Sequence, residues 1–187
     1  MNPEQLLKKI AEILDDLKIS YAVTGGFALS IWGKTRTTLD IDIIIEMEEK
    51  NIKPLAKKMI EVDKNIYVDE DMMRDALTHK SEFNFIEPEF GLKVDFFVLA
   101  NNPYNKLKIK RATLQDVVGV AKAYFVSPED LILSKLSWGK ESDSWKQRED
   151  VKTILENPNI KLDLKYLRNW SEKQGTIEIL EDIIKKL

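Results

Sequence analysis

The spacing of apolar side chains predicts that the chain begins with a helix, a strand, a tight turn and a second helix. Over residues 3–18, apolar residues recur every three or four positions, which is the period of an amphipathic helix. Residues 21–24 form a short run of strand character, and it stops at Gly25-Gly26. A short helix is expected to follow over residues 27–32.

The same kind of pattern predicts a sheet in the middle of the chain. We expect strands over residues 40–45, 81–87, 92–99, 108–114 and 120–125, and helices over residues 48–62 and 72–77. The segment from Pro88 to Gly91 separates two of these strands, which favours a hairpin-like pairing between them.

From residue 127 onward the pattern is helical. Helices are expected from residue 128 and over residues 144–155, 163–172 and 176–186. Ser127 precedes Pro128 as a helix cap. The predicted fold class is therefore α+β (mixed α/β), with a mixed sheet flanked by helices over residues 1–127 and a C-terminal helical section over residues 128–187. Because no glycine-rich linker divides the two, we expect the helical section to pack directly on the core.

The composition excludes several kinds of catalytic chemistry. The 187 residues include no cysteine, which rules out disulfides, thiolate nucleophiles, iron–sulfur clusters and cysteine-based zinc sites. A single histidine, His79, rules out the two-histidine zinc motif. Any chemistry must therefore depend on carboxylates, lysine, arginine or backbone groups.

The absence of cysteine and of an export signal favours a cytoplasmic protein, and no membrane partner is expected. No apolar run approaches the roughly 20 residues that a membrane helix needs, and the first residues are polar, without a signal-peptide core. The formal net charge of −3 argues against a broad nucleic-acid surface. However, three aspartates, Asp40, Asp42 and Asp95, account for this whole excess of negative charge. A metal bound to them would make the protein neutral or slightly positive, so the net charge is poor evidence against a nucleic-acid substrate.

Two aspartates that are one residue apart, Asp40 and Asp42, are the first candidates for chemistry. Side chains two apart on a strand project from the same face, so both carboxylates approach one point. A cation between them relieves their repulsion, and magnesium prefers such hard oxygen ligands together with phosphate oxygens. The alternative is a chance pair at a solvated strand end.

A third carboxylate, Asp95, stands inside the strongly apolar segment 93–98. Burying this charge without a partner costs roughly several kcal/mol, so the residue needs a cation or strong donors nearby. A structural salt bridge to lysine or arginine is the alternative to a metal.

Two loops complete the pattern. Gly25-Gly26 lies between a strand and a helix, where bare N–H groups and the positive end of the helix dipole attract phosphate; a tight turn with positive φ is the alternative. The basic loop 33–38 places cationic and hydroxyl groups directly before Asp40, where they can meet phosphate or a nucleobase.

Taken together, these motifs resemble the signature of the DNA polymerase beta-like nucleotidyltransferase superfamily. That signature is a hydrophobic-Gly-Gly turn, a gap of about a dozen residues, an Asp-hydrophobic-Asp pair and a third carboxylate on a later strand. Here 13 residues lie between Gly26 and Asp40, and Val94-Asp95-Phe96 supplies the third carboxylate. Over residues 127–151 the chain is also similar to small prokaryotic nucleotidyltransferases related to AbiEii-type toxins.

The resemblance implies roles for particular residues. Asp40, Asp42 and Asp95 are implied to be the catalytic and metal-binding residues, holding two Mg²⁺ ions, or Mn²⁺ in their place. The implied nucleotide-binding residues are Thr24, Gly25, Gly26, Arg36, Thr38 and Lys135. For Lys135 a contact with the triphosphate competes with a solvated lysine on a helix.

The resemblance also implies a magnesium-dependent nucleotidyltransferase, of the kind classed under EC 2.7.7. It transfers a nucleoside monophosphate from a nucleoside triphosphate such as ATP to a hydroxyl of RNA, protein or a small molecule, with release of pyrophosphate. The first alternative is a catalytically silent nucleotide-binding regulatory or toxin–antitoxin module with an antitoxin-type partner. The second is an interaction protein in which the three aspartates only form salt bridges.

Overall fold

The structure is a computed structural model, and it describes residues 2–34, 38–89, 91–117, 121–142 and 144–187. The chain separates into two compact units. The first unit comprises Met1–Phe27 and Thr37–Val126, and the second comprises Ala28–Arg36 and Ser127–Leu187. The second unit is thus built from two separate stretches of the sequence.

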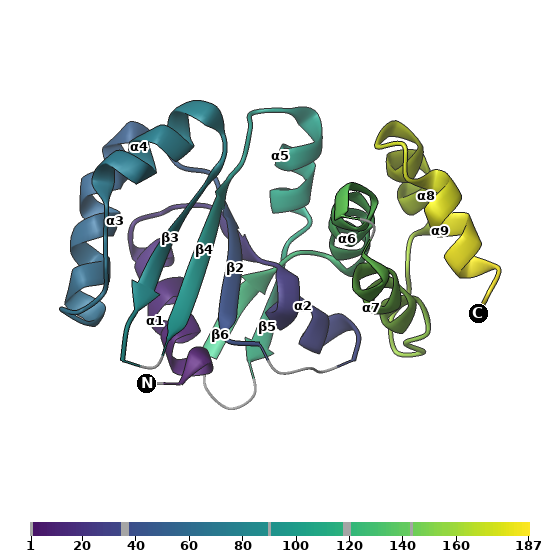
Figure 1. The fold of residues 1–187 in the computed structure, drawn as a ribbon, viewed down its shortest axis with the longest axis horizontal. Helices are drawn as coiled ribbons and strands as arrows, with labels where there is room; N and C mark the ends of the chain where they lie inside the picture. Colours follow the sequence, from purple (N-terminus) through teal and green to yellow (C-terminus); the bar gives the residue numbers. More distant parts are fainter. Residues whose placement is uncertain (1, 35–37, 90, 118–120, 143) are drawn as a thin grey trace. The chain divides into compact units, whose positions relative to one another are not determined.

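The first unit contains a six-stranded mixed sheet with the strand order β3-β4-β2-β1-β6-β5 (Figure 1). The strands are β1 (Tyr21–Val23), β2 (Asp40–Ile45), β3 (Glu82–Glu87), β4 (Leu92–Val98), β5 (Thr113–Val117) and β6 (Ala121–Phe125). Pairing is parallel between β2 and β4 and between β1 and β6, and antiparallel between the other neighbours. This confirms the predicted α+β class and the predicted pairing of β3 with β4.

The helices of this unit follow the predicted order, with one addition. They are α1 (Pro3–Asp16), α3 (Glu49–Val62), α4 (Glu70–His79) and α5 (Pro103–Lys110), together with the first residues of α2 (Gly25–Trp32). Helix α1 begins at a capping box, in which the Gln5 N–H donates to Asn2 Oδ1 at 2.8 Å and the Asn2 N–H donates to Gln5 Oε1 at 3.1 Å. Such a cap contributes about 1 kcal/mol to helix stability.

The expected strand over residues 108–114 is wrong over its first half. Residues 108–110 end helix α5, and strand β5 begins only at Thr113. The reason is that a helix begins at Pro103, although the apolar pattern that follows resembles a strand. Pro103 occupies the first turn, and Asn102 Oδ1 accepts a hydrogen bond from the Asn105 N–H at 2.9 Å. The strand expected over 120–125 is β6, and residue 120 lies outside the described residues.

The sheet has one apolar face and one polar face near the start of β2. Along β2, Ile41, Ile43 and Ile45 are buried, and the same face of the sheet carries a cluster of aromatic rings. In that cluster Phe83 and Phe96 stack with ring centroids 5.1 Å apart. Helix α1 packs on β6 and β2, and α4 packs on β3. Side-chain alternation therefore leaves the aspartates of β2 on the opposite, polar face.

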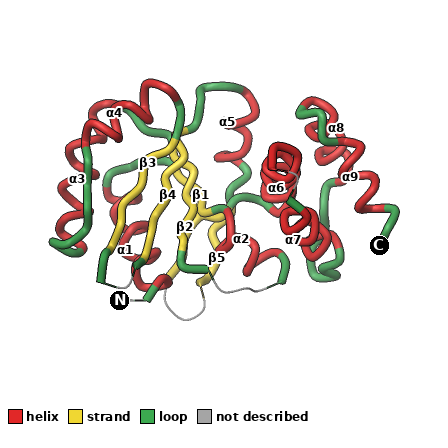
Figure 2. The backbone as a smooth tube through the Cα atoms, in the orientation of Figure 1, coloured by secondary structure: helices red, strands yellow, loops and turns green. Residues whose placement is uncertain are grey.

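The second unit contains helix but no strand over its described residues (Figure 2). Its helices are α6 (Pro128–Ser142), α7 (Trp145–Leu155), α8 (Leu164–Lys173) and α9 (Ile177–Ile184), with the remainder of α2. Ser127 caps α6 as predicted, because its Oγ accepts a hydrogen bond from the Asp130 N–H at 3.1 Å. Among the described helices of the whole chain, none has the length and hydropathy to cross a membrane.

Candidate active site

The parallel pairing of β2 with β4 brings the predicted carboxylates onto neighbouring strands. Asp42 is the direct register partner of Asp95, and Asp40 is the register partner of Lys93. Because alternate residues of a strand share a face, these four side chains lie on the same face of the sheet. Asp40 is exposed, Asp42 is half-buried and Asp95 is buried.

The glycine turn after β1 lies directly against this face. Gly25 has a φ of +59°, and a Cβ at that position would overlap the carboxylate of Asp42. The main chain is tied to the same residue, since the Thr24 N–H donates to the carbonyl oxygen of Asp42 at 2.8 Å. Glycine is therefore required at position 25 both for its backbone conformation and for the space that Asp42 occupies.

Helix α2 begins at Gly25, two residues before its predicted start. The Gly25 and Gly26 N–H groups thus belong to the first turn, where backbone donors have no intrahelical acceptor. These donors and the positive end of the helix dipole lie at the same place as the Asp42 side chain. An anion such as phosphate and a carboxylate-bound cation can therefore meet here.

Thr38 and Arg36 belong to the loop before β2. A Cβ at Gly26 would lie 2.9 Å from the Thr38 Cβ, so Thr38 packs against the glycine turn. The Thr38 hydroxyl donates to the Asp40 carbonyl oxygen at 3.2 Å, which fixes the threonine at the entrance of β2. Arg36 lies outside the described residues.

A lysine that the sequence argument did not single out, Lys93, lies beside the predicted carboxylates. Lys93 Nζ lies 2.8 Å from Asp95 Oδ1. The hydrogen bond to Asp95 raises the pKa of Lys93 above its ordinary value, and partial burial opposes this effect. The negative charges of Asp40 and Glu82 add to the rise. The salt-bridge alternative for Asp95 is thus present in the structure.

Lys93 and one further polar residue, Asn84, complete the face. Asn84 on β3 is the register partner of Asp95. Lys93 had a signal in the sequence, because a residue two positions before Asp95 on a strand must share its face. Asn84 had none, since its place beside Asp95 depends on the register of the β3–β4 hairpin.

The three predicted carboxylates do not form a preassembled cage. Among the described residues, the one group of three acidic side chains with oxygens all within 4.8 Å of one another is Asp63, Glu87 and Glu89. Two of these carboxylates bond nearby backbone, with Asp63 accepting from the Asn65 N–H and Glu87 from the Glu89 N–H. At the predicted site, Lys93 holds one Asp95 oxygen and Asp42 lies against Gly25, so the carboxylates are held by different partners.

Lys135 belongs to the second unit, on α6. Its side chain is only 1% exposed, and Nζ donates to Asp150 Oδ2 at 2.6 Å and to Gln147 Oε1 at 3.1 Å. The alternative of a solvated helix lysine is therefore wrong. The contact with a triphosphate stays a prediction.

A cavity of about 390 Å³ also occurs in the first unit, and no predicted site residue lines it. Its lining includes Asp15, Tyr21 and Tyr124. Tyr21 is the first residue of β1, whereas the glycine turn follows the last residue of that strand, so the cavity and the carboxylates lie at opposite ends of β1. The chemistry is therefore assigned from the polar face of the sheet and not from this cavity.

Three solved structures with a similar fold are described as nucleotidyltransferase-like or adenylyltransferase proteins or were solved with an adenylylated product. An antigenic nucleotidyltransferase-like protein from Paracoccidioides brasiliensis is 20% identical, with a TM-score of 0.51 over 98% of this chain and 92% of that one. The lincosamide antibiotic adenylyltransferase LnuA, solved with lincomycin, is 14% identical, with a TM-score of 0.54 over 83% of this chain and 98% of its own. ANT(2″)-Ia in complex with adenylyl-2″-tobramycin is 15% identical, with a TM-score of 0.53 over 92% and 97%. At these identities the likeness establishes the fold.

A comparison with curated protein sequences gives no significant match. A family model described as "Nucleotidyltransferase of unknown function (DUF6036)" matches residues 3–184, which is nearly the whole chain and includes both units. The glycine turn, the aspartate pair and the third carboxylate all lie within the matched range. The chain belongs to this nucleotidyltransferase family, DUF6036.

Proposed function

We propose that the protein is a magnesium-dependent nucleotidyltransferase that transfers a nucleoside monophosphate from a nucleoside triphosphate to a hydroxyl acceptor, with release of pyrophosphate. Asp42 carries this proposal. On one side it is the register partner of Asp95, and on the other it lies against Gly25 in the first turn of α2. One residue thus joins the carboxylates to the backbone donors that suit a phosphate.

The donor set fits a divalent cation. Asp40, Asp42 and Asp95 offer only hard carboxylate oxygens, which Mg²⁺ and Mn²⁺ prefer. Neighbouring strands lie about 4.8 Å apart, so rotation about the side-chain bonds is enough to bring the three carboxylates to a common ion. Bound there, divalent ions supply Lewis-acid activation of the phosphate and neutralise charge on the attacking and leaving oxygens.

The residues around the carboxylates are assigned to the nucleotide. The Gly25 and Gly26 N–H groups bind phosphate oxygens at the start of α2, and Thr24 holds this turn to β2 through its backbone bond. Thr38, Arg36 and Lys135 are proposed as additional nucleotide contacts. Asp95, on the strand beside Asp42, is proposed to help activate the acceptor hydroxyl.

The acceptor is a hydroxyl of RNA, protein or a small molecule. Of the proteins with a similar fold, LnuA is a lincosamide antibiotic adenylyltransferase, and ANT(2″)-Ia was solved with adenylyl-2″-tobramycin. This supports ATP as the first donor to test and hydroxylated small molecules as the first acceptors. The relationship to AbiEii-type toxins, with an antitoxin-type partner, remains a prediction.

Transfer of label from α-³²P nucleoside triphosphates tests the proposal. The protein is incubated with Mg²⁺ and each of the four triphosphates, with RNA, protein and aminoglycoside acceptors in parallel. Wild type should release pyrophosphate and label an acceptor, whereas Asp42→Asn should lose at least about 100-fold of the rate. Asp116→Asn, on the edge strand β5, is the control and should keep the wild-type rate.

Two outcomes would contradict the proposed enzymatic activity. If wild type and Asp42→Asn both give only the same background transfer, the assignment of the active site to Asp42 is wrong. Nucleotide-dependent thermal stabilisation without pyrophosphate release, for every donor and acceptor, favours the silent nucleotide-binding module instead.

A further inference from the structure

Lys93 is a basic residue placed among the acidic residues of the proposed metal site. It lies two residues before Asp95 on β4 and is the register partner of Asp40 on β2. Its ammonium nitrogen is 2.8 Å from Asp95 Oδ1, within the range of a charge-assisted hydrogen bond. The Lys93 ammonium therefore acts as a counter-ion to the acidic side chains of the proposed metal site.

The two side chains differ in exposure, so the Lys93 ammonium has more room to move than the Asp95 carboxylate. The Lys93 side chain is 40% exposed, whereas the Asp95 side chain is 12% exposed. Lysine has a flexible four-carbon stem and a compact charge with rotatable donors. Both residues lie on β4, an interior strand between β2 and β3, so their backbones are equally fixed, and the longer, more exposed lysine side chain is the member of the pair that can move away.

A divalent cation and this ammonium compete for the same carboxylate. Two positive charges on neighbouring oxygens of one aspartate repel each other, so binding of the metal at Asp95 weakens the bond to Lys93. A nucleoside triphosphate brings several negative charges to the same face, because its proposed phosphate site at Gly25 adjoins Asp42. A lysine displaced from Asp95 can then bind a phosphate oxygen, in competition with the nearby carboxylates of Asp40 and Glu82.

We propose that Lys93 is a positioning residue that holds Asp95 in the metal-free protein, yields it to the divalent cation, and then binds a phosphate of the incoming triphosphate. The proposal rests on the proposed function, because it takes the same three aspartates as the metal ligands. It adds a residue that makes metal and nucleotide binding depend on each other.

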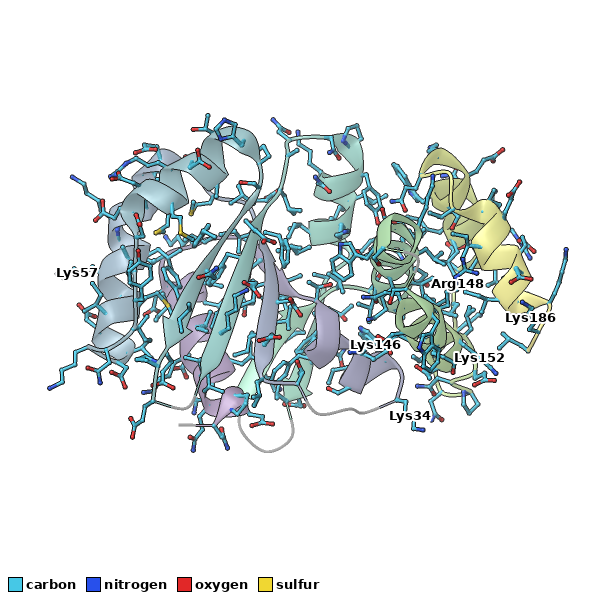
Figure 3. All side chains as sticks on the ribbon, in the orientation of Figure 1. Lys34, Lys57, Lys146, Arg148, Lys152 and Lys186 are labelled. Atoms are coloured by element: carbon cyan, nitrogen blue, oxygen red, sulfur yellow. The ribbon has the colours of Figure 1, made fainter. Side chains whose placement is uncertain are left out.

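Metal and nucleotide binding by Lys93→Met and Lys93→Arg test this. Mn²⁺ affinity is measured without nucleotide from the electron paramagnetic resonance of the free ion. Affinity for a non-hydrolysable ATP analogue is measured by calorimetry at saturating Mg²⁺. Lys57→Met is the matched control, since Lys57 is an exposed lysine on α3 (Figure 3).

Lys93→Met should bind Mn²⁺ on the order of 10-fold more tightly than wild type, because removal of one positive charge about 6 Å from a divalent ion is worth that factor in a water-like medium. The same variant should bind the ATP analogue on the order of 10-fold more weakly. Lys93→Arg keeps the charge and should stay near wild type in both measurements, as should Lys57→Met.

A lysine with only a structural role gives a different pattern. Lys93→Met then binds Mn²⁺ equally or more weakly, because Asp95 loses its support, and this result overturns the proposal. Unchanged binding of the ATP analogue overturns it as well, and so does a wild type that binds no Mn²⁺. The Mn²⁺ titration needs neither a nucleotide donor nor an acceptor. If Lys93→Met shows the expected changes in Mn²⁺ and ATP-analogue binding but wild type transfers no nucleotide, the role of Lys93 stands and the proposed function is contradicted.

Discussion

The carboxylate of Asp42 lies so close to the α-carbon of Gly25 that no side chain fits between them. This contact joins a strand residue to a helix start 17 positions earlier in the chain. It makes the glycine turn and the aspartate pair a single structural feature, so a change in either residue must affect the other.

Gly25→Ala should abolish nucleotidyl transfer. The new methyl group overlaps the Asp42 side chain and forces it out of its position beside Asp95 and the helix start, and the positive φ adds about 1 kcal/mol of backbone strain. Transfer rate and thermal unfolding are measured together. Gly91→Ala is the matched control, because Gly91 also has positive φ, at +65°, but a Cβ there meets nothing within 4 Å. A Gly25→Ala protein as active as Gly91→Ala would contradict the role of this contact.

Mg²⁺ should stabilise the wild-type fold, and chelation should reverse this. A ligand that binds only the native state at 100 times its dissociation constant adds about 2.7 kcal/mol to the free energy of unfolding. Asp40→Asn and Asp42→Asn should lose most of that increment, since each replaces a charged carboxylate ligand with a neutral amide. Thermal unfolding with Mg²⁺ and with EDTA measures it. Stabilisation of equal size in both variants would place the ion elsewhere, for example at Asp63, Glu87 and Glu89.

Lys135→Met should destabilise the second unit by roughly 3–5 kcal/mol, because it removes one member of a largely buried ion pair, Lys135 with Asp150. Urea unfolding measures the change. Lys152→Met is the control: its pair with Glu156 is partly exposed and 3.8 Å long, so the cost should stay below about 1 kcal/mol. The double variant Lys135→Met/Asp150→Leu should recover most of the loss, and a double variant as unstable as Lys135→Met would refute the ion-pair explanation.

The cap of α4 should give the fold part of its acid sensitivity. The pKa of Asp69 is lowered, first by the hydrogen bond from the Met72 N–H and then by the Tyr67 hydroxyl. A lowered native pKa means that the charged cap stabilises the fold above the unfolded value, about 3.9, and that this contribution disappears as the pH falls through the lower native value.

Asp69→Asn keeps a capping side chain but removes this titration, so the free energy of unfolding should fall less steeply below about pH 4. Chemical unfolding at several pH values gives the slope. Asp116→Asn provides the comparison, and the same acid slope in wild type and Asp69→Asn would show that the cap does not contribute.

Local features of the sequence were sufficient to predict most elements. The helix at 3–18, the strand at 40–45 and the Ser127 cap all depend on residues within a few positions of one another, and the structure contains each of them with small changes at the ends. The wrong prediction of a strand at residues 108–110 also came from local features. A helix start at Asn102 and Pro103 and a strand-like apolar pattern gave conflicting signals there.

The alternation of side chains in β2, the spacing to Gly25-Gly26 and the carboxylate at Asp95, together with the family resemblance, predicted an acidic site and a glycine turn suited to phosphate. Three relationships required the tertiary structure: the pairing of Asp42 with Asp95, the bond from Lys93 to Asp95, and the burial of Lys135 against Asp150. Each joins residues through strand register or helix packing. Periodicity determines which face a side chain occupies, but register and packing decide which side chain it meets there, and these are set by burial over the whole fold.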